Sequence, residues 1–188
     1  MVNLYLAFLL LLGAERLLEL ALSRRNAARA FARGAVEVGR GHFPFLASAH
    51  GLFLAACAAE VLLLARPFPG AIGWIALGLA IGAQALRYWA IASLGDRWNV
   101  RVIVERDAAP VVSGPYRFVR HPNYLAVIVE MLCVPLVHGA WITAVCFSVV
   151  NAVLLRTRIR VEEAALGPRW SAAFAAQPRF FPGGRHGR

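Results

Sequence analysis

The residues best suited to chemistry lie in a polar, turn-rich stretch, residues 113–124, between two long apolar runs. A Gly-Pro turn signal opens this stretch, and Pro122 favours a non-helical His121 followed by a helix that begins at the proline. The sequence therefore places His121, Asn123 and Tyr124 at a helix N-terminus. Backbone N–H groups at such an end lack partners within the helix and carry partial positive charge, which suits a carboxylate or a phosphate.

A second group of candidates lies in the polar segment after the last apolar run. Arg158 and Glu162 are four residues apart, so on a helix their side chains share a face, with Glu163 beside them. Taken alone, this spacing more often indicates a solvated ion pair of little energetic worth. Glu130 differs because it lies inside an apolar run, where a carboxylate is costly. Such a residue either lines a substrate pocket or packs against a partner.

Composition limits the class of protein. The 188 residues are 60% hydrophobic and 16% charged, with a mean hydropathy of +0.61. This is too apolar for an ordinary soluble domain and too short for two domains, so the sequence predicts an integral membrane protein. Every basic side chain other than histidine is arginine, and alanine is abundant. This usage indicates a GC-rich bacterial genome, and hence a bacterial inner membrane.

Five apolar runs predict an all-α membrane bundle of about five transmembrane helices. These runs cover residues 2–22, 45–65, 71–94, 125–137 and 140–155. A bilayer core of about 30 Å needs about 20 helical residues, so the last two runs predict a short, tilted hairpin, and the first run is expected to remain as an anchor. We expect a single membrane domain over 1–188. Within it, 1–97 would supply the N-terminal spans and 98–188 the cofactor- and substrate-binding half.

The distribution of the net charge of +10 predicts an orientation in the membrane. Arginines follow the first, third and last apolar runs, whereas the connections at 66–70 and 138–139 are nearly uncharged. This alternation is typical of cytoplasmic basic loops that contact anionic lipid, and it predicts an outward N-terminus with a cytoplasmic C-terminus and cofactor site. No aromatic-interleaved basic surface accompanies the arginines, so nucleic acid is not an expected partner. The oligomeric state does not follow from the sequence.

Other polar residues of the apolar runs are expected to play structural parts. Glu15, Arg16 and Glu19 predict a self-neutralised cluster near the membrane interface, and Arg87 is expected to snorkel to that interface. The cysteines form no C-x-x-C pair, so they predict small core residues and no metal site. These cysteines are Cys57, Cys133 and Cys146.

Two separated motifs resemble one known family. The motifs are Arg120-His121-Pro122-Asn123-Tyr124, preceded by Gly114-Pro115-Tyr116, and the later Arg158, Glu162 and Glu163. Together they resemble the isoprenylcysteine carboxyl methyltransferase family of integral membrane enzymes. The resemblance covers roughly residues 98–182, and two motifs in the right order are more specific than one. The N-terminal half resembles the family only as hydrophobic spans.

The resemblance implies S-adenosylmethionine as the cofactor and a set of residues that contact it. These residues are Tyr116, His121, Pro122, Asn123, Tyr124 and Glu162, with the backbone of Ala108, Ala109, Pro110 and Val111 near the adenosine. No G-x-G-x-x-G motif follows a strand, so a soluble Rossmann-type donor site is not encoded. By the same resemblance, Arg158 would orient an anionic acceptor and Glu162 would hold the donor. An acceptor hydroxyl would need a base, for which Glu130 or Glu162 is the candidate.

The implied activity is O-methylation of a lipophilic acceptor. The carboxylate of a prenylcysteine is one acceptor, and an enol or phenol oxygen of an alkylpyrone-type lipid, as in bacterial relatives, is the other. Alternatives are a phospholipid N-methyltransferase, a non-enzymatic membrane scaffold and an NADPH-dependent sterol-type reductase. The reductase would need arginines for a 2′-phosphate, and Arg101, Arg106 and Arg117 are available in sequence.

Overall fold

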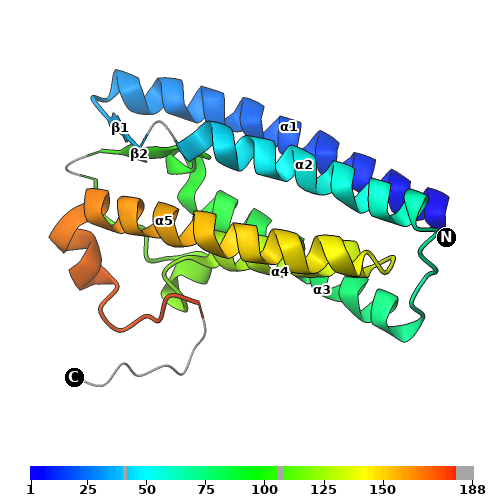
Figure 1. The fold of residues 1–188 in the computed structure, drawn as a ribbon. Coiled ribbons are helices and arrows are strands. Elements are labelled where there is room, and N and C mark those ends of the chain that lie inside the picture. Colours follow the sequence, from blue (N-terminus) through cyan, green and yellow to red (C-terminus); the bar gives the residue numbers. More distant parts are fainter. Residues whose placement is uncertain (40–41, 106–107, 181–188) are drawn as a thin grey trace.

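The computed structural model describes residues 1–39, 42–105 and 108–180. In this part of the chain five helices run back and forth along one direction: α1 (Val2–Ala32), α2 (His42–Leu63), α3 (Ala71–Leu94), α4 (Pro122–Leu136) and α5 (Trp141–Ala173) (Figure 1). Strands β1 (Val36–Val38) and β2 (Val102–Val104) and the 3-10 turns η1 (Gly95–Arg97) and η2 (Gly114–Arg117) complete the described elements. The expectation of a mostly helical fold is confirmed.

The helices form two groups whose polar connections meet at one end. Helices α1 and α2 lie side by side, while α3 packs on α4 and α4 on α5 (Figure 1). The two strands and the end of α5 lie at one end of the bundle, opposite the chain's N-terminus and the short turns α2–α3 and α4–α5. The two motif segments therefore reach the same end, although they are separated along the sequence.

Small side chains let α3 approach α4 closely. Ala76, Ala80 and Ala83 of α3 are buried on one stripe, at spacings of three and four residues. Small residues at such positions allow two helix backbones to come near each other. On the outer faces large apolar side chains stay uncovered, for example Leu10 at 76% and Leu63 at 82% exposed. Surfaces of this kind suit contact with lipid.

Two helical segments are long and apolar enough to cross a membrane, judged by length and composition. They are Ala71–Arg97 and Trp141–Ala173, whereas Ala47–Leu63 and Pro122–Leu136 are apolar but shorter. The number of helices agrees with the sequence expectation. That all five cross the membrane stays a prediction.

Helix α1 extends well beyond its apolar run, so its expected end near residue 22 is wrong. It continues through Arg24, Arg25 and Arg29 to Ala32. Alanine and arginine are strong helix formers, and no glycine or proline interrupts this stretch. The extension has a structural use, because Asn26 donates from Nδ2 to the carbonyl oxygens of Gly95 at 3.2 Å and Trp98 at 2.9 Å.

Helix α5 likewise continues from the apolar run into the polar segment. Arg158 and Glu162 thus lie on the same rigid helix as the apolar residues, as their spacing predicted. The helix bends at Gly167, whose φ of 74° is favoured by glycine, just before Pro168. The bend brings Trp170 and Phe174 back toward the start of α4.

A segment that we term the strap, residues 95–105, crosses the polar end of the bundle. Its strand β2 pairs antiparallel with β1, with Val36 opposite Val104. Arg33 at the end of α1 binds Asp96 at 2.8 Å and Glu105 at 2.6 Å. Trp98 of the strap is buried, with 3% exposed. Among the cysteines, Cys57 and Cys133 are buried as expected, whereas Cys146 is exposed.

Candidate active site

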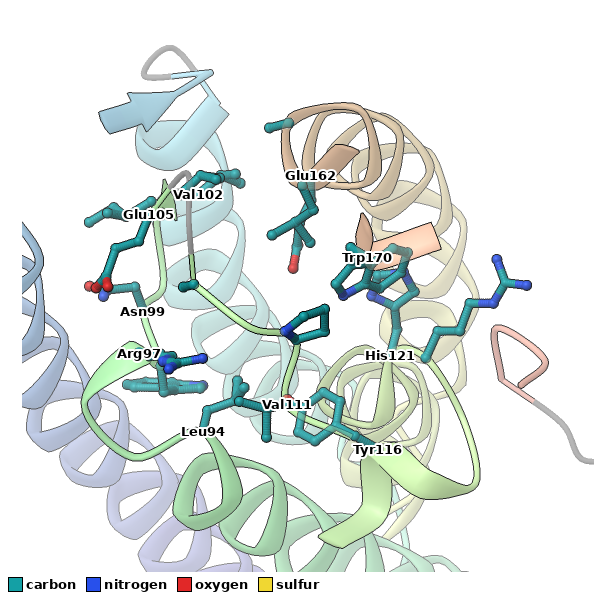
Figure 2. A pocket seen from close by; sticks show the side chains of 18 of the residues that line it. Leu94, Arg97, Asn99, Val102, Glu105, Val111, Tyr116, His121, Glu162 and Trp170 are labelled. Atoms are coloured by element: carbon teal, nitrogen blue, oxygen red, sulfur yellow. The ribbon is translucent and has the colours of Figure 1, made fainter. Parts of the chain in front are cut away.

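A cavity of about 590 Å³ lies at the polar end of the bundle, between the strap, the start of α4 and the bent end of α5 (Figure 2). This volume lies within the range of about 300–1,000 Å³ that is usual for small-molecule and cofactor sites. We term it the donor cavity.

The donor cavity collects the residues that the resemblance assigned to the cofactor. Its lining includes Tyr116, His121, Asn123, Tyr124, Glu162, Ala108, Ala109, Pro110 and Val111. Pro122 is absent from the lining because it is fully buried at the first position of α4. Pro122 instead determines the backbone conformation. His121 before it has φ −129° and ψ 62°, outside the helical region, and α4 begins at Pro122 itself.

Aromatic side chains form one wall of the donor cavity. The His121 ring stacks on Tyr124, with centroids 5.3 Å apart, and lies 5.5 Å from Trp170. Phe174, 1% exposed, packs against Trp170 at 4.8 Å. Tyr116 lies near this wall (Figure 2), and burial raises the pKa of its hydroxyl well above the usual value, so the group stays protonated. Such a wall suits the flat face of a purine.

His121 is held by a chain of contacts that ends in the C-terminal segment. Its Nε2 lies 3.1 Å from Oε1 of Glu163, and Arg179 binds the same carboxylate through Nε at 3.1 Å and Nη2 at 2.6 Å. The hydrogen bond to Glu163 raises the pKa of Arg179 above its usual value. In addition, the backbone N–H of His121 donates to the carbonyl of Arg179 at 3.3 Å. The role of Glu163 is therefore to position His121.

Arg158, Tyr124 and Glu162 form a second chain of contacts. Arg158 donates from Nε to the Tyr124 hydroxyl oxygen at 2.7 Å, and that hydroxyl donates to Oε2 of Glu162. The Arg158 guanidinium also lies over the Tyr124 ring, 5.5 Å from its centroid. These contacts place the arginine and the glutamate in the site, as the resemblance implied, and not as a solvated pair.

The strap supplies a wall that sequence reasoning missed. Arg97, Asn99, Val102 and Glu105 line the donor cavity (Figure 2), and Arg97 also donates to the carbonyl of Ala109 at 2.6 Å. The resemblance implies no particular donor contact within residues 99–107. The alternating Val100–Val104 pattern signals a strand, but its partner, β1, comes from a distant segment.

A second cavity of about 910 Å³ opens beside the first, between α1, α2 and the ends of α4 and α5. We term it the apolar cavity, since most of its lining is aliphatic: Leu6, Leu9, Leu17, Leu54, Val127 and Leu155 are examples. The two cavities share Trp98, Asn99, Asn123, Tyr124 and Arg158 as lining residues. The Arg158–Tyr124 contact therefore lies where the cavities meet.

Glu130 lines neither of these two cavities. Its carboxylate binds Arg87, with Oε2 2.9 Å from Nη2 and Oε1 3.3 Å from Nε. Arg87 is 4% exposed, so the expected snorkelling is wrong; it is a buried, paired cation. Through Nη1 it also reaches Oδ1 of Asn123 at 3.4 Å, which links Glu130 indirectly to the site.

The polar residues of α1 belong to the same buried network. Glu19 lies 3.6 Å from Arg87 and 2.9 Å from Arg16, and Arg16 also binds Gln84 at 3.0 Å. The network is thus shared between α1, α3 and α4, although the sequence predicted a local interfacial cluster. Three of its members, Arg16, Glu19 and Arg87, line the apolar cavity. Within the described residues, no three His, Cys, Asp or Glu side chains gather as metal ligands.

A helical bundle with a cofactor-sized cavity opening onto an apolar one defines an enzyme-like membrane site. Comparison with known families agrees with this class: residues 75–168 match the isoprenylcysteine carboxyl methyltransferase (ICMT) family. The chain belongs to this family, whose members are membrane methyltransferases that use S-adenosylmethionine. The matched region runs from α3 to the bend of α5 and contains both motifs.

Two curated bacterial proteins are similar over most of the chain. The uncharacterized protein YpbQ of Bacillus subtilis (strain 168) is 41% identical over 157 residues, which cover 83% of this chain and 92% of YpbQ. An uncharacterized protein of Haemophilus influenzae (strain ATCC 51907 / DSM 11121 / KW20 / Rd) is 29% identical over 154 residues, 81% of this chain and 89% of that protein. Neither relative has a stated activity.

Proposed function

We propose that this protein transfers a methyl group from S-adenosylmethionine to an oxygen atom of a lipophilic acceptor at the membrane–cytosol interface. The observation that carries the proposal is the meeting of the donor cavity and the apolar cavity at Tyr124 and Arg158. A polar donor and an apolar acceptor can then approach each other from opposite sides of the same residues.

The residues of the donor cavity fit the proposed cofactor. When bound, S-adenosylmethionine supplies a methyl group on a positively charged sulfur. Arg97 and Arg120 line the cavity and suit its carboxylate, while Glu105 and Glu162 suit its ammonium or ribose hydroxyls. The aromatic wall around His121 offers stacking to the adenine. A cavity of about 590 Å³ is large enough for a ligand of this class.

The apolar cavity suits the hydrocarbon part of the acceptor. Arg158 would orient an acceptor oxyanion, and positioning alone supplies part of the roughly 7–11 kcal/mol available from pre-organisation. A carboxylate needs no proton removal, whereas an enol or phenol hydroxyl does. Glu162 remains the candidate base for such a proton. It does not line the apolar cavity itself, but it accepts a hydrogen bond from the Tyr124 hydroxyl, and Tyr124 lines both cavities. An apolar enclosure also favours methyl transfer, because the positive charge of the donor sulfur and the negative charge of the acceptor oxygen cancel in this step.

The acceptor class and the orientation belong to the same proposal. We favour an alkylpyrone-type lipid over a prenylcysteine, on the expected bacterial source. The donor cavity would face the cytoplasm of a bacterial inner membrane, with the N-terminus outside. Residues 1–188 would act as one domain. Residues 98–188 supply most of the donor cavity, to which Ala30, Leu94 and Arg97 contribute from the first half. Most of the apolar cavity is lined by residues 1–97, chiefly from α1 and α2, so the expected assignment of both sites to residues 98–188 holds for the donor cavity alone.

Two of the arginines considered for an NADPH-dependent reductase are described by the structure. Arg101 lines the donor cavity but is paired with Glu37 at 2.9 Å, and Arg117 is not part of the lining and lies over the Phe118 ring, 4.6 Å from its centroid. Arg106 lies outside the described residues. An N-methyltransferase is also less favoured, because Arg158 at the junction suits an anionic oxygen better than an amine.

Isothermal titration of the purified protein with S-adenosylhomocysteine and with NADPH tests the proposal. We expect saturable binding of S-adenosylhomocysteine only, followed by transfer of a labelled methyl group from S-adenosylmethionine to an alkylpyrone or a prenylcysteine analogue. Binding of NADPH alone would favour the reductase. Binding of neither compound by a well-folded protein would favour a non-enzymatic scaffold.

A further inference from the structure

A third hollow lies along α5 and does not include Arg158 in its lining. It has a volume of about 510 Å³ and is formed by α5, Ile128 of α4 and the C-terminal residues Arg179 and Phe180. Leu155 is its one residue in common with the apolar cavity, and none of its described lining residues lines the donor cavity. We term it the α5 groove. It is separate from the proposed active site.

The α5 groove is amphiphilic along its length. Its α5 residues recur at spacings of three and four, from Ser148 to Arg160, so they form one stripe about 18 Å long on the helix. Asn151, Ala152 and Leu155 lie in the middle of this stripe. The stripe ends with the charged side chains of Arg156 and Arg160, toward the end of α5 nearest the donor cavity. An elongated molecule with an anionic head and an apolar tail matches this order.

The charged end of the groove carries three arginines. Arg156 and Arg160 are both exposed, and neither forms an ion pair with any residue that the structure describes. Arg179 provides a third guanidinium beside them.

We propose that the α5 groove binds an anionic membrane phospholipid, with the phosphate at Arg156 and Arg160 and one acyl chain along the stripe. Guanidinium groups bind phosphate oxygens in pairs of hydrogen bonds, and anionic lipids concentrate at basic membrane-proximal segments. The inference does not depend on the proposed methyl transfer.

The groove is also connected to the donor cavity through protein contacts. Arg179, at the rim of the groove, binds Glu163, and Glu163 contacts His121 in the donor cavity. A lipid phosphate that also binds Arg179 would hold the contacts from Arg179 through Glu163 to His121 in place. Lipid in the α5 groove would therefore strengthen binding of the methyl donor.

Native mass spectrometry of the full chain, delipidated in detergent and then exposed to phosphatidylglycerol or phosphatidylcholine, tests the site. We expect the wild type to retain phosphatidylglycerol in preference to phosphatidylcholine. Arg156→Gln/Arg160→Gln should bind phosphatidylglycerol about tenfold or more weakly, because two arginine–phosphate contacts are lost. The matched control Arg24→Gln/Arg25→Gln removes two exposed arginines of α1 and should bind like the wild type.

A second variant distinguishes lipid binding in the α5 groove from a general attraction of anionic lipid to arginines. Ala152→Trp leaves every arginine in place but fills the apolar part of the stripe, so it should also lose phosphatidylglycerol. Retention by this variant, or equal loss in the α1 control, would overturn the proposal. Displacement of the lipid by millimolar inorganic phosphate would show a phosphate site without an acyl chain, and would overturn it too. Titration of S-adenosylhomocysteine in delipidated wild type tests the proposed methyltransferase separately, and repeating it with phosphatidylglycerol tests whether lipid strengthens donor binding.

Discussion

The Nε atom of Arg158 lies 2.7 Å from the hydroxyl oxygen of Tyr124, which joins α5 to the first turn of α4. The same hydroxyl donates to Glu162, so it lies between two side chains that are four residues apart on one helix. The three groups form one hydrogen-bonded chain at the junction of the donor cavity and the apolar cavity. Catalysis at this point should therefore depend on the hydroxyl as well as on the charges.

Tyr124→Phe removes this hydroxyl and keeps the ring that stacks on His121. We expect turnover to fall about 10- to 100-fold, since an unmet polar partner in a buried site costs about 1–3 kcal/mol. Donor affinity should change little. Single-turnover methyl transfer and titration with S-adenosylhomocysteine measure the two effects. Tyr88→Phe, at an exposed tyrosine of α3, is the control, and equal turnover in both variants would contradict the role of Tyr124.

His121→Ala should weaken donor binding at least about tenfold, because it removes a stacking surface and a polar group from the cavity wall. His138→Ala is the matched control: His138 is also buried, at 2% exposed against 4% for His121, and lies at the other end of the bundle beside Tyr5. Thermal unfolding in detergent shows whether each variant folds. Wild-type affinity in folded His121→Ala would remove this residue from the donor site.

Most of the helices could be predicted from sequence, because apolar runs and proline or glycine boundaries are local signals. Helix α3 has the predicted bounds, and α4 begins at Pro122 as predicted. The long end of α1 could not be predicted from hydropathy, because the arginines end the apolar run. Helix propensity is the local signal that could have shown it, since alanine and arginine continue there without glycine or proline. The contact of Asn26 with the strap carries no local pattern and could not be predicted.

The donor site could be predicted where short motifs supply the residues, as at His121 and Glu162. The strap wall could not, because Asn99 and Glu105 are held there by residues of a distant segment: Ser23 donates to Asn99 at 3.0 Å, and Arg33 binds Glu105 at 2.6 Å. The pairing of Arg87 with Glu130 also could not be predicted from the sequence. A buried ion pair and a snorkelling arginine look the same in sequence, and the choice depends on whether the two helices meet.

The pair Arg87–Glu130 gives a prediction about stability. Glu130→Leu leaves a buried guanidinium without its main partner, and breaking a buried pair in this way costs about 3–5 kcal/mol. Arg87→Met/Glu130→Leu removes both charges and should recover most of that loss. Thermal unfolding in detergent measures both, with the exposed Asp96→Asn as control. If Glu130→Leu kept its stability and lost only turnover, Glu130 would be a catalytic base after all.

Reporter fusions test the orientation predicted from the arginine distribution. Fusions after Arg40 and Arg188 should report the cytoplasm, and a fusion after Gly70 the opposite side, since cytoplasmic loops carry the excess of arginine. Residues 40 and 188 lie outside the described residues, but the fusions need only the chain's sequence. A cytoplasmic signal after Gly70 would exclude the arrangement with five crossings.

The last prediction separates Arg158 from Glu162. If they were only an exposed ion pair, each alanine variant would cost at most about 1 kcal/mol of stability and leave turnover nearly unchanged. We expect Arg158→Ala to lower turnover and acceptor affinity while donor binding is retained, because the guanidinium lines the apolar cavity as well as the donor cavity. Glu162→Ala should abolish measurable donor binding, because Glu162 lines only the donor cavity and its loss would leave cationic or hydroxyl groups of the donor unpaired.

Donor titration of both variants, followed by single-turnover transfer to an alkylpyrone or a prenylcysteine analogue, distinguishes these outcomes. Arg156→Ala, two residues from Arg158 on the same helix but lining the α5 groove, is the matched control and should keep both activities in lipid-free detergent. Identical mild effects of Arg158→Ala and Glu162→Ala would show that the two act only as a surface pair. The site would then be reduced to the donor cavity around His121, with no residue to orient the acceptor.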